Sequence, residues 1–145
     1  MNTDGLELGK GGHSLLQLCL RLKDKGVDIV CIAETNVQWE RAHVYHKFRH
    51  TLKDAWPKHK MSYWTSESDI KWNSDCKPGG TAMFTLDNVS SAVLQKGQDP
   101  SGMGRWTFIK ILGKNNSRTT IFTMYRPCKG QIETVGDATI INSNS

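Results

Sequence analysis

The feature that most constrains the fold is an apolar run at residues 27–33, Val-Asp-Ile-Val-Cys-Ile-Ala, which ends directly at Glu34. Its length, its β-branched content and its near lack of polar residues predict a strand that is covered on both faces. Glu34 then places a carboxylate where this strand leaves the core. Ligands of open α/β sheets bind beyond the carboxyl ends of the strands, so this carboxylate can bind a hard cation such as Mg²⁺. The alternative is an acid that stabilises a helix N-terminus in a strand-to-helix loop.

Size and composition indicate one ordinary globular domain. The chain has 145 residues, of which 37% are hydrophobic and 23% are charged. No stretch approaches the roughly 20 apolar residues of a membrane span, and the polar start carries no secretory signal. We therefore expect an intracellular protein, nuclear or cytoplasmic, with no membrane partner. Nineteen Lys and Arg residues against fourteen Asp and Glu residues give a net charge of +5, which favours a polyanionic partner.

The four cysteines are widely scattered and form no Cys-x-x-Cys pair. Two of them lie inside apolar segments, as reduced cysteines of a protein core usually do. This spacing argues against a zinc ribbon and against a disulfide framework.

Periodicity predicts two helices and a series of strands. Leucines at helical spacing predict a helix over residues 14–25, and apolar residues on one face predict a second over residues 39–56, ended by Pro57. Short strands are expected at residues 61–64, 81–85, 91–94, 106–112 and 119–125. Residues 113–116, Gly-Lys-Asn-Asn, are expected to join the last two strands as a hairpin. We predict an α/β (α+β) fold with one mixed sheet, largely antiparallel in its later strands, and flanking helices.

The second predicted helix carries two competing patterns on its polar side. His43, His46 and His50 could share one face and, with His59, hold a metal ion. The same helix and the turn after it also carry cations, which make a solvated basic surface the simpler account and which could contact phosphates. These cations are Lys47, Arg49, Lys53 and Lys58.

Five short motifs occur in a fixed order along the chain. They are Asn2-Thr3-Asp4-Gly5-Leu6, Ile32-Ala33-Glu34-Thr35, Gly79-Gly80-Thr81-Ala82-Met83, Gly104-Arg105-Trp106 and Met124-Tyr125-Arg126-Pro127. None is specific by itself. Together and in this order, with a helix between the first two, they resemble the first half of the endonuclease/exonuclease/phosphatase family, over about residues 1–128. The Tyr-Arg-Pro-Cys variant looks most like the endonuclease domains of non-LTR retrotransposons.

The resemblance implies a partial DNase I-like four-layer sandwich, of which this chain would build mainly one sheet and its helices. The corresponding domain would span residues 1–130, and residues 131–145 would form a polar tail or the start of a missing element. We expect the domain to be truncated at both ends. One apolar sheet face would then be bare, and either a partner covers it or stability is poor.

The resemblance also suggests roles for individual residues. Glu34 is similar to the metal-binding glutamate of the family, and Asp4 to the carboxylate that supports the ion directly or through water. The implied cofactor is Mg²⁺, with Mn²⁺ as the alternative. Asn2 resembles the amide that orients the nucleophile's acidic partner, and Tyr125 resembles the phenol beside the scissile phosphate. Arg105 would have a structural or phosphate-proximal role.

In the family, activation of the attacking water and stabilisation of the leaving oxygen fall to two later motifs, a Gly-Asp-x-Asn segment and a terminal segment that contains histidine. This chain has no match to either, since its last histidine is His59 and residues 136–139 are Gly-Asp-Ala-Thr. We therefore expect a fragment of a Mg²⁺-dependent phosphodiesterase or endonuclease that is inactive alone. Its partner would be nucleic acid, with DNA favoured over RNA, together with the missing half of its own domain or a downstream reverse transcriptase. The alternative is a non-enzymatic basic nucleic-acid-binding module or a degenerate remnant.

Overall fold

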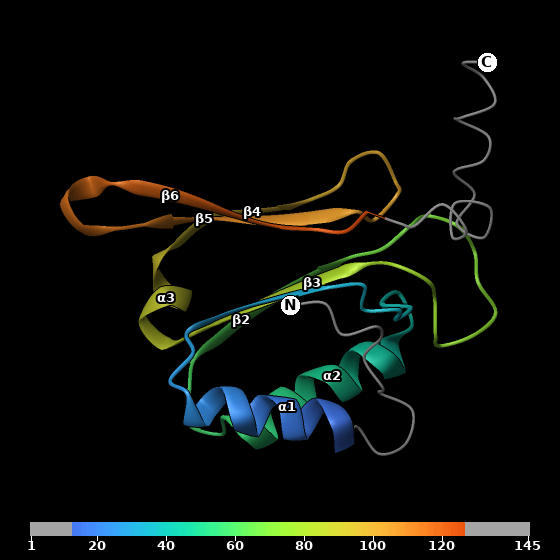
Figure 1. The fold of residues 1–145 in the computed structure, drawn as a ribbon, viewed down its shortest axis with the longest axis horizontal. Helices are drawn as coiled ribbons and strands as arrows, with labels where there is room; N and C mark the ends of the chain where they lie inside the picture. The colour runs from blue at the N-terminus through green and yellow to red at the C-terminus, as the bar shows by residue number, and fades with distance from the viewer. Residues whose placement is uncertain (1–12, 127–145) are drawn as a thin grey trace.

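The computed structural model describes residues 13–126, which are arranged in three layers (Figure 1). Helices form the first layer, and two stacked β-sheets form the second and third. The helices are α1 His13–Asp24, α2 Ala42–Ala55 and α3 Asp87–Ala92. The strands are β1 Ile29–Ala33, β2 Met61–Ser66, β3 Thr81–Leu86, β4 Val93–Gln98, β5 Trp106–Leu112 and β6 Arg118–Met124. These layers account for three of the four that the sequence predicted.

Residues 13–126 build two three-stranded sheets, ordered β1-β3-β2 and β4-β5-β6, and every strand pair in them is antiparallel. The prediction of one mixed sheet is therefore wrong. The later strands leave the first sheet because α3 follows β3 directly and redirects the chain into β4 (Figure 1). Local sequence patterns identify strands but not the strands with which they pair. The change of sheet depends on α3, a helix of only six residues that no sequence pattern marked.

The other element predictions are confirmed with shifted boundaries. The second helix begins at Ala42 rather than Trp39, because Trp39 is buried and donates its Nε1–H to Thr35 Oγ1 at 3.2 Å in the preceding loop. The strand predicted at residues 91–94 begins two residues later and is longer: α3 extends to Ala92, and β4 covers residues 93–98. Most side chains of β4 are exposed, so no alternating apolar pattern marks it. The hairpin at residues 113–116 is confirmed, with a short 3₁₀ turn, Lys114–Asn116, between β5 and β6.

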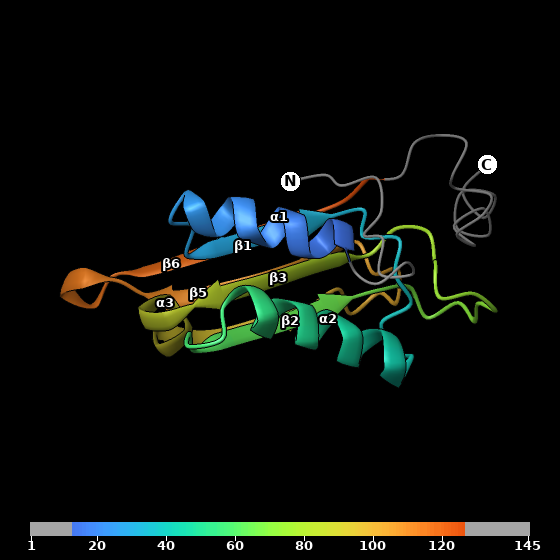
Figure 2. The ribbon, with the colours of Figure 1, turned by 90° about the horizontal axis from the view of Figure 1, so that it is seen from below.

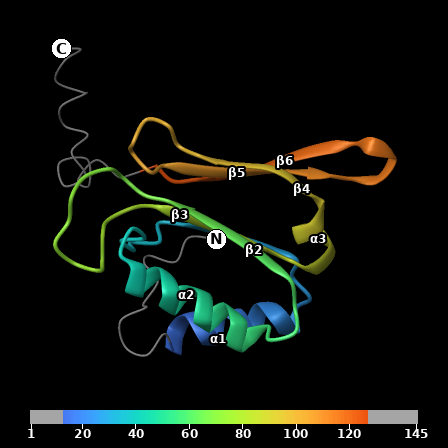
Figure 3. The ribbon, with the colours of Figure 1, turned by 180° about the vertical axis from the view of Figure 1, so that it is seen from behind.

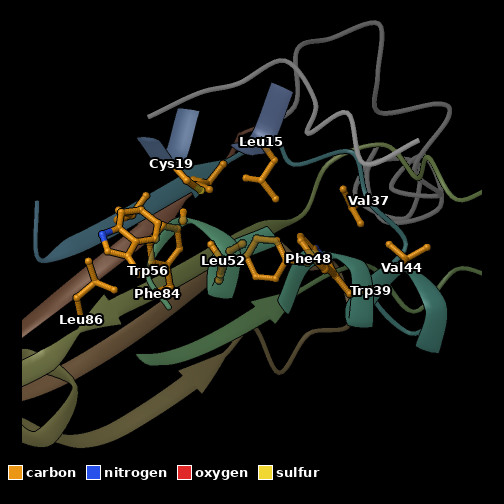
Figure 4. Packing of buried hydrophobic residues seen from close by; sticks show 14 residues of the cluster. Leu15, Cys19, Val37, Trp39, Val44, Phe48, Leu52, Trp56, Phe84 and Leu86 are labelled. Carbon is orange, nitrogen blue, oxygen red and sulfur yellow. The ribbon is translucent and has the colours of Figure 1, made fainter. Parts of the chain in front are cut away.

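The main core lies between the helical layer and the first sheet. Figure 2 shows α1 lying along β1 and α2 lying along β2. Aromatic rings fill the space between α2 and the sheet (Figure 4). Phe48 meets Trp39 edge to face with ring centres 4.9 Å apart, and Trp56 lies 5.6 Å from Phe84. Burial of these large rings is the dominant stabilising contribution of this layer.

A smaller core joins the two sheets. Trp64 and Met83 from the first sheet pack with Ile109 from the second, and Ile29 and Cys31 of β1 pack against the same cluster. The alternate residues of β1 face the helices. The prediction that residues 27–33 form a strand covered on both faces is therefore confirmed for β1.

The far face of the second sheet is not covered by any helix of residues 13–126 (Figure 3). Its exposed apolar side chains include Leu112, Phe122 and Met124, which are 41%, 56% and 69% exposed. The bare apolar face expected from the sequence lies here. The predicted tail at residues 131–145 lies outside the described residues. No helix in the described part of the chain combines the length and hydrophobicity that crossing a membrane requires.

We expect Phe48→Ala to lower the free energy of unfolding by roughly 3–5 kcal/mol, because Phe48 is fully buried and its removal leaves a cavity beneath α2. Met124→Ala is the control, since Met124 is 69% exposed and its truncation should change stability by about 0.5 kcal/mol or less. Urea denaturation followed by circular dichroism measures both. Equal effects of the two substitutions would contradict the assignment of the main core.

Candidate functional site

The chain leaves β1 through a turn with unusual backbone geometry. Glu34 and Asn36 both have positive φ angles, 58° and 52°, and Thr35 between them is fully buried. A non-glycine residue in this region costs about 1–3 kcal/mol and persists only where its surroundings impose it. Glu34 itself is half-buried. The strained turn therefore fixes a carboxylate-bearing residue at the exit of the covered strand.

Gly79 and Gly80, just before β3, hold this turn. The amides of Thr35 and Asn36 donate to the carbonyls of Gly80 and Gly79 at 3.2 and 2.7 Å, which continues the β1–β3 ladder. Asn36 Oδ1 also accepts a hydrogen bond from the Gly79 amide at 2.7 Å. The turn that begins at Glu34 is thus held by the segment around Gly79, which lies 45 residues further along the chain.

Neither glycine leaves room for a side chain. A Cβ at Gly80 would lie 2.9 Å from Thr35 Oγ1, and a Cβ at Gly79 would lie 3.0 Å from Cε1 of Tyr125. The Tyr125 ring therefore lies directly against Gly79. Through this glycine, the structure brings the residue after β6 into contact with the segment that holds the turn after β1.

Arg105 reaches the same end of the sandwich. Its carbonyl accepts a hydrogen bond from the Tyr125 amide at 2.8 Å, which extends the β5–β6 ladder by one step. Its own amide donates to Asp99 Oδ2 at 3.0 Å. The predicted residues Glu34, Arg105 and Tyr125 thus come from three strand ends that meet at one end of the molecule. Asn2 and Asp4, also predicted for this site, lie outside the described residues.

Asp99 organises the loop that precedes Arg105. The same carboxylate accepts hydrogen bonds from the amide and the hydroxyl of Ser101, at 3.0 and 2.6 Å. Burial of Asp99 raises its pKa, but the hydrogen bonds from Ser101 and from the Arg105 amide favour the charged form and hold the pKa below its usual value. The loop is therefore ordered by an ionised acid.

An ion pair between the buried Lys77 and the half-buried Glu67 joins the remaining loops. Lys77 is 3% exposed, and its Nζ lies 3.3 Å from Glu67 Oε2 and donates to the Ser68 carbonyl at 2.5 Å. The Lys77 amide donates to the Asn36 carbonyl at 3.0 Å, and Glu67 Oε1 accepts from the Glu40 amide at 2.7 Å. Burial raises the pKa of Glu67, and the nearby Lys77 charge opposes this shift. The pair connects the turn after β1 with both ends of the β2–β3 loop.

The β4–β5 loop docks onto this pair through Gly104, where a Cβ would clash with the backbone of Glu67 at 2.0 Å. The sequence did not single out Lys77, Glu67 or Asp99. A lysine is usually exposed, so no local signal marks Lys77 as buried. The Asp-Pro-Ser-Gly turn at residues 99–102 was detectable, since aspartate commonly accepts from amides two residues on.

The histidine-based metal site is not supported. His43 Nε2 lies 3.0 Å from Asp75 Oδ2, and Arg41 binds the other oxygen of that carboxylate at 2.7 Å. His59 pairs instead with Asp87, with Nδ1 2.6 Å from Oδ2. Within residues 13–126, no group of three or more His, Cys, Asp or Glu side chains is arranged to hold a metal ion.

We expect Gly80→Ala to destabilise the protein more than Gly26→Ala. Both glycines have positive φ angles, 80° and 65°, so both substitutions carry the backbone cost of roughly 1–2 kcal/mol. Only at Gly80 would the new methyl also press on Thr35 and on the Ser66 carbonyl, whereas Gly26 has nothing within 4 Å. Urea denaturation of both variants tests this. A larger loss for Gly26→Ala would contradict the close packing around the turn.

We expect Asp99→Ala to lower the free energy of unfolding by about 1–3 kcal/mol at pH 7, because three partly buried donors of Ser101 and Arg105 lose a charged acceptor. A depressed pKa in the folded state contributes stability that is present above the unfolded value, here 3.8, and is lost as the pH falls through the folded value. The difference between wild type and variant should therefore shrink below about pH 4. Denaturant titrations from pH 7 to pH 2.5 measure it, and a constant difference would contradict this account.

Comparison with known proteins identifies the fold. No protein family model matches the sequence, and no curated protein matches it. Among solved structures, the chain is similar to an endonuclease/exonuclease/phosphatase family protein from Leptotrichia buccalis, with a TM-score of 0.55 and 12% sequence identity. The match covers 99% of this chain and 60% of that chain, so this chain spans about 60% of its neighbour's length. The described α/β architecture is therefore a partial DNase I-like fold.

Proposed function

We propose that this chain supplies one half of the site of a Mg²⁺-dependent phosphodiesterase that acts on nucleic acid. The observation that carries the proposal is the meeting of Glu34's turn and Tyr125 across Gly79, in a fold shared with an endonuclease/exonuclease/phosphatase protein. Two sheets contribute to this arrangement, as expected for a site at the strand ends of a sandwich. The motif order and the Tyr-Arg-Pro-Cys segment favour a retrotransposon-type enzyme. A nucleic-acid substrate would put it in the nucleus or the cytoplasm.

Glu34 fits the chemistry of a magnesium ligand. Mg²⁺ is commonly bound by one or two carboxylates together with waters and substrate phosphates, so a single acid within residues 13–126 is compatible with such a site. Asp4 is the second proposed ligand, and Mn²⁺ would fit the same oxygen donors. When bound, the cation would neutralise charge on the phosphate and so favour attack on it. The turn holds the backbone of Glu34 in one conformation, so only its side chain would lose freedom when the carboxylate binds a cation.

The chain's own residues would bind and orient the phosphodiester. The Tyr125 hydroxyl can donate a hydrogen bond to a phosphate oxygen as negative charge develops there. Arg105, held through its backbone by Asp99 and Tyr125, would add positive charge on the same side. Asn2 would orient the acidic partner of the nucleophile. This sequence matches neither the Gly-Asp-x-Asn segment nor the terminal histidine segment of the family, so we propose that it does not cleave by itself.

A second candidate function is non-enzymatic binding of nucleic acid through α2 and the turn after it. Lys53 and Lys58 are exposed, together with His46 and His50. Arg49 is engaged, because its guanidinium lies 5.5 Å from the centre of the Tyr63 ring. Fewer cations are therefore available on this surface than the four basic residues predicted from the sequence. Electrostatic binding of the surface to phosphates would be weak and salt-dependent.

We expect Glu34→Gln to weaken Mn²⁺ binding by roughly tenfold or more, because a ligand charge is lost while the shape is kept. Water-proton relaxation reports Mn²⁺ binding without requiring activity. Asp54→Asn is the matched control, since Asp54 is an exposed acid on α2 and should leave the affinity unchanged. Equal affinities for wild type and Glu34→Gln would overturn the assignment of Glu34.

Plasmid nicking with Mg²⁺ separates the two candidate functions. We expect no nicking by residues 1–145 alone, and any nicking must disappear in Glu34→Ala. Nicking that persists in Glu34→Ala would contradict the proposed site. DNA retention in a gel-shift assay, lost in Lys53→Glu/Lys58→Glu and unchanged in Glu34→Ala, would favour the second candidate.

A further inference from the structure

We infer that Lys77 is a positioning residue of the proposed site. Its side chain ties together the two ends of the β2–β3 loop, residues 67–80. In this way it fixes the distance between the turn that carries Glu34 and the loop that carries Arg105. The inference deepens the proposed function and rests on it for the role of Glu34, whereas the contacts of Lys77 are tested separately.

The burial of Lys77 is unusual for a lysine. Its side chain is only 3% exposed, and lysines are almost never buried to this extent unless their charge is paired. Nζ donates to the carbonyl of Ser68, nine residues earlier in the chain, at 2.5 Å and lies 3.3 Å from Glu67 Oε2. Both contacts are made to the residues that directly follow β2. These two contacts, called here the lysine clasp, join the beginning of the loop to its end.

The end of the loop holds the turn after β1. The Lys77 amide donates to the Asn36 carbonyl at 3.0 Å, and Val37 and Cys76 form an antiparallel bridge beside it. Two residues after Lys77, the Gly79 amide donates to Asn36 Oδ1 at 2.7 Å. The position of the turn therefore depends on the backbone around Lys77.

The beginning of the loop holds the β4–β5 loop. The Asp69 amide donates to the Gly102 carbonyl at 2.8 Å, and Ser68 and Met103 form a second antiparallel bridge. Arg105 follows Met103 by two residues. Figure 1 shows the β2–β3 and β4–β5 loops at the same end of the sandwich. The beginning of the loop therefore positions the segment of the second sheet that leads to Arg105.

The lysine clasp links these two sets of contacts. Glu34 and Arg105 are carried by segments that opposite ends of one loop hold, so their spacing depends on how closely those ends are tied. Glu67 adds a third attachment, because its Oε1 accepts from the Glu40 amide at 2.7 Å in the segment after the turn. Supporting contacts of this kind keep the residues of a site within a fraction of an ångström of one geometry.

The unaltered protein gives the first test of the lysine clasp. Burial and hydrogen bonding slow the exchange of ammonium protons with water, so heteronuclear NMR of the full chain should detect the Lys77 ammonium at neutral pH. Lys71 is the control, since it is an exposed lysine of the same loop and its ammonium protons should exchange too fast to be detected. Equally fast exchange at both lysines would overturn the inference.

Lys77→Met tests the link between the loops, because it keeps a long apolar side chain and removes the ammonium. We expect amide exchange at Asn36 and Asp69 to accelerate by roughly tenfold or more. The acceleration at Met83, which is fully buried in the central strand β3, should be smaller. An acceleration that is largest at Met83 would indicate lost global stability and would overturn the inference.

Lys77→Met/Glu67→Gln gives the same comparison of amides if the single variant does not fold. This double variant avoids leaving the acid charged and half-buried without its partner. The glutamine retains an oxygen that can accept from the Glu40 amide.

Cation binding separates positioning from charge. Lys77→Met removes a positive charge, which by itself would strengthen Mn²⁺ binding at Glu34. Loss of positioning has the opposite sign, so we expect Lys77→Met to weaken Mn²⁺ binding by roughly tenfold in water-proton relaxation. Lys71→Met, the matched control, should not weaken it.

Unchanged or tighter Mn²⁺ binding by a folded Lys77→Met variant would overturn the positioning role. Equal Mn²⁺ affinities of wild type and Glu34→Gln would instead overturn the proposed function. In that case the exchange rates at Asn36 and Asp69 would still confirm or refute the lysine clasp.

Discussion

The arrangement at the strand ends depends on the close approach of Gly79 and Gly80 to the turn after β1. Two backbone hydrogen bonds and the Asn36 side chain hold that turn in a left-handed conformation that its residues would otherwise avoid. The Tyr125 ring occupies the space that a side chain at Gly79 would take. The absence of two Cβ atoms therefore allows both sheets to contribute to one site. A larger residue at Gly79 would press on the Tyr125 ring, and one at Gly80 would press on Thr35 in the turn that carries Glu34.

The buried pair of Lys77 and Glu67 gives this arrangement its rigidity at an energetic cost. Burying charges is repaid only when hydrogen bonds satisfy them. Here the Ser68 carbonyl accepts from Lys77 and Glu67 Oε1 accepts from the Glu40 amide, whereas Glu67 Oε2 has only the Lys77 charge 3.3 Å away. Removing one partner would leave the other charged and buried, which is far more costly than the pair itself. The ion pair therefore specifies one loop arrangement more than it adds stability. This specificity matters where a strained residue such as Glu34 must keep one conformation.

Sequence patterns predicted the parts of this fold that are encoded locally. The apolar run ending at Ala33, the leucine spacing of α1 and the Gly-Lys-Asn-Asn hairpin each fix an element through its own residues. The motif order also grouped Glu34, Arg105 and Tyr125 before their strand ends could be seen to meet. Strand partners, the short α3 and the burial of Lys77 depend on contacts between distant residues, so no local pattern reveals them. The division into two sheets was missed for this reason.

The exposed apolar face of the second sheet and the strand-end site are both carried by β5 and β6. Trp106 directly follows Arg105, and Tyr125 directly follows Met124, so the same strands carry apolar anchors outward and polar residues to the site. The contact between the sheets is modest at this end, where the buried hydroxyls of Thr107 and Thr123 find no hydrogen-bond partner within residues 13–126. Covering the outer face would therefore stabilise the strands that position Arg105 and Tyr125.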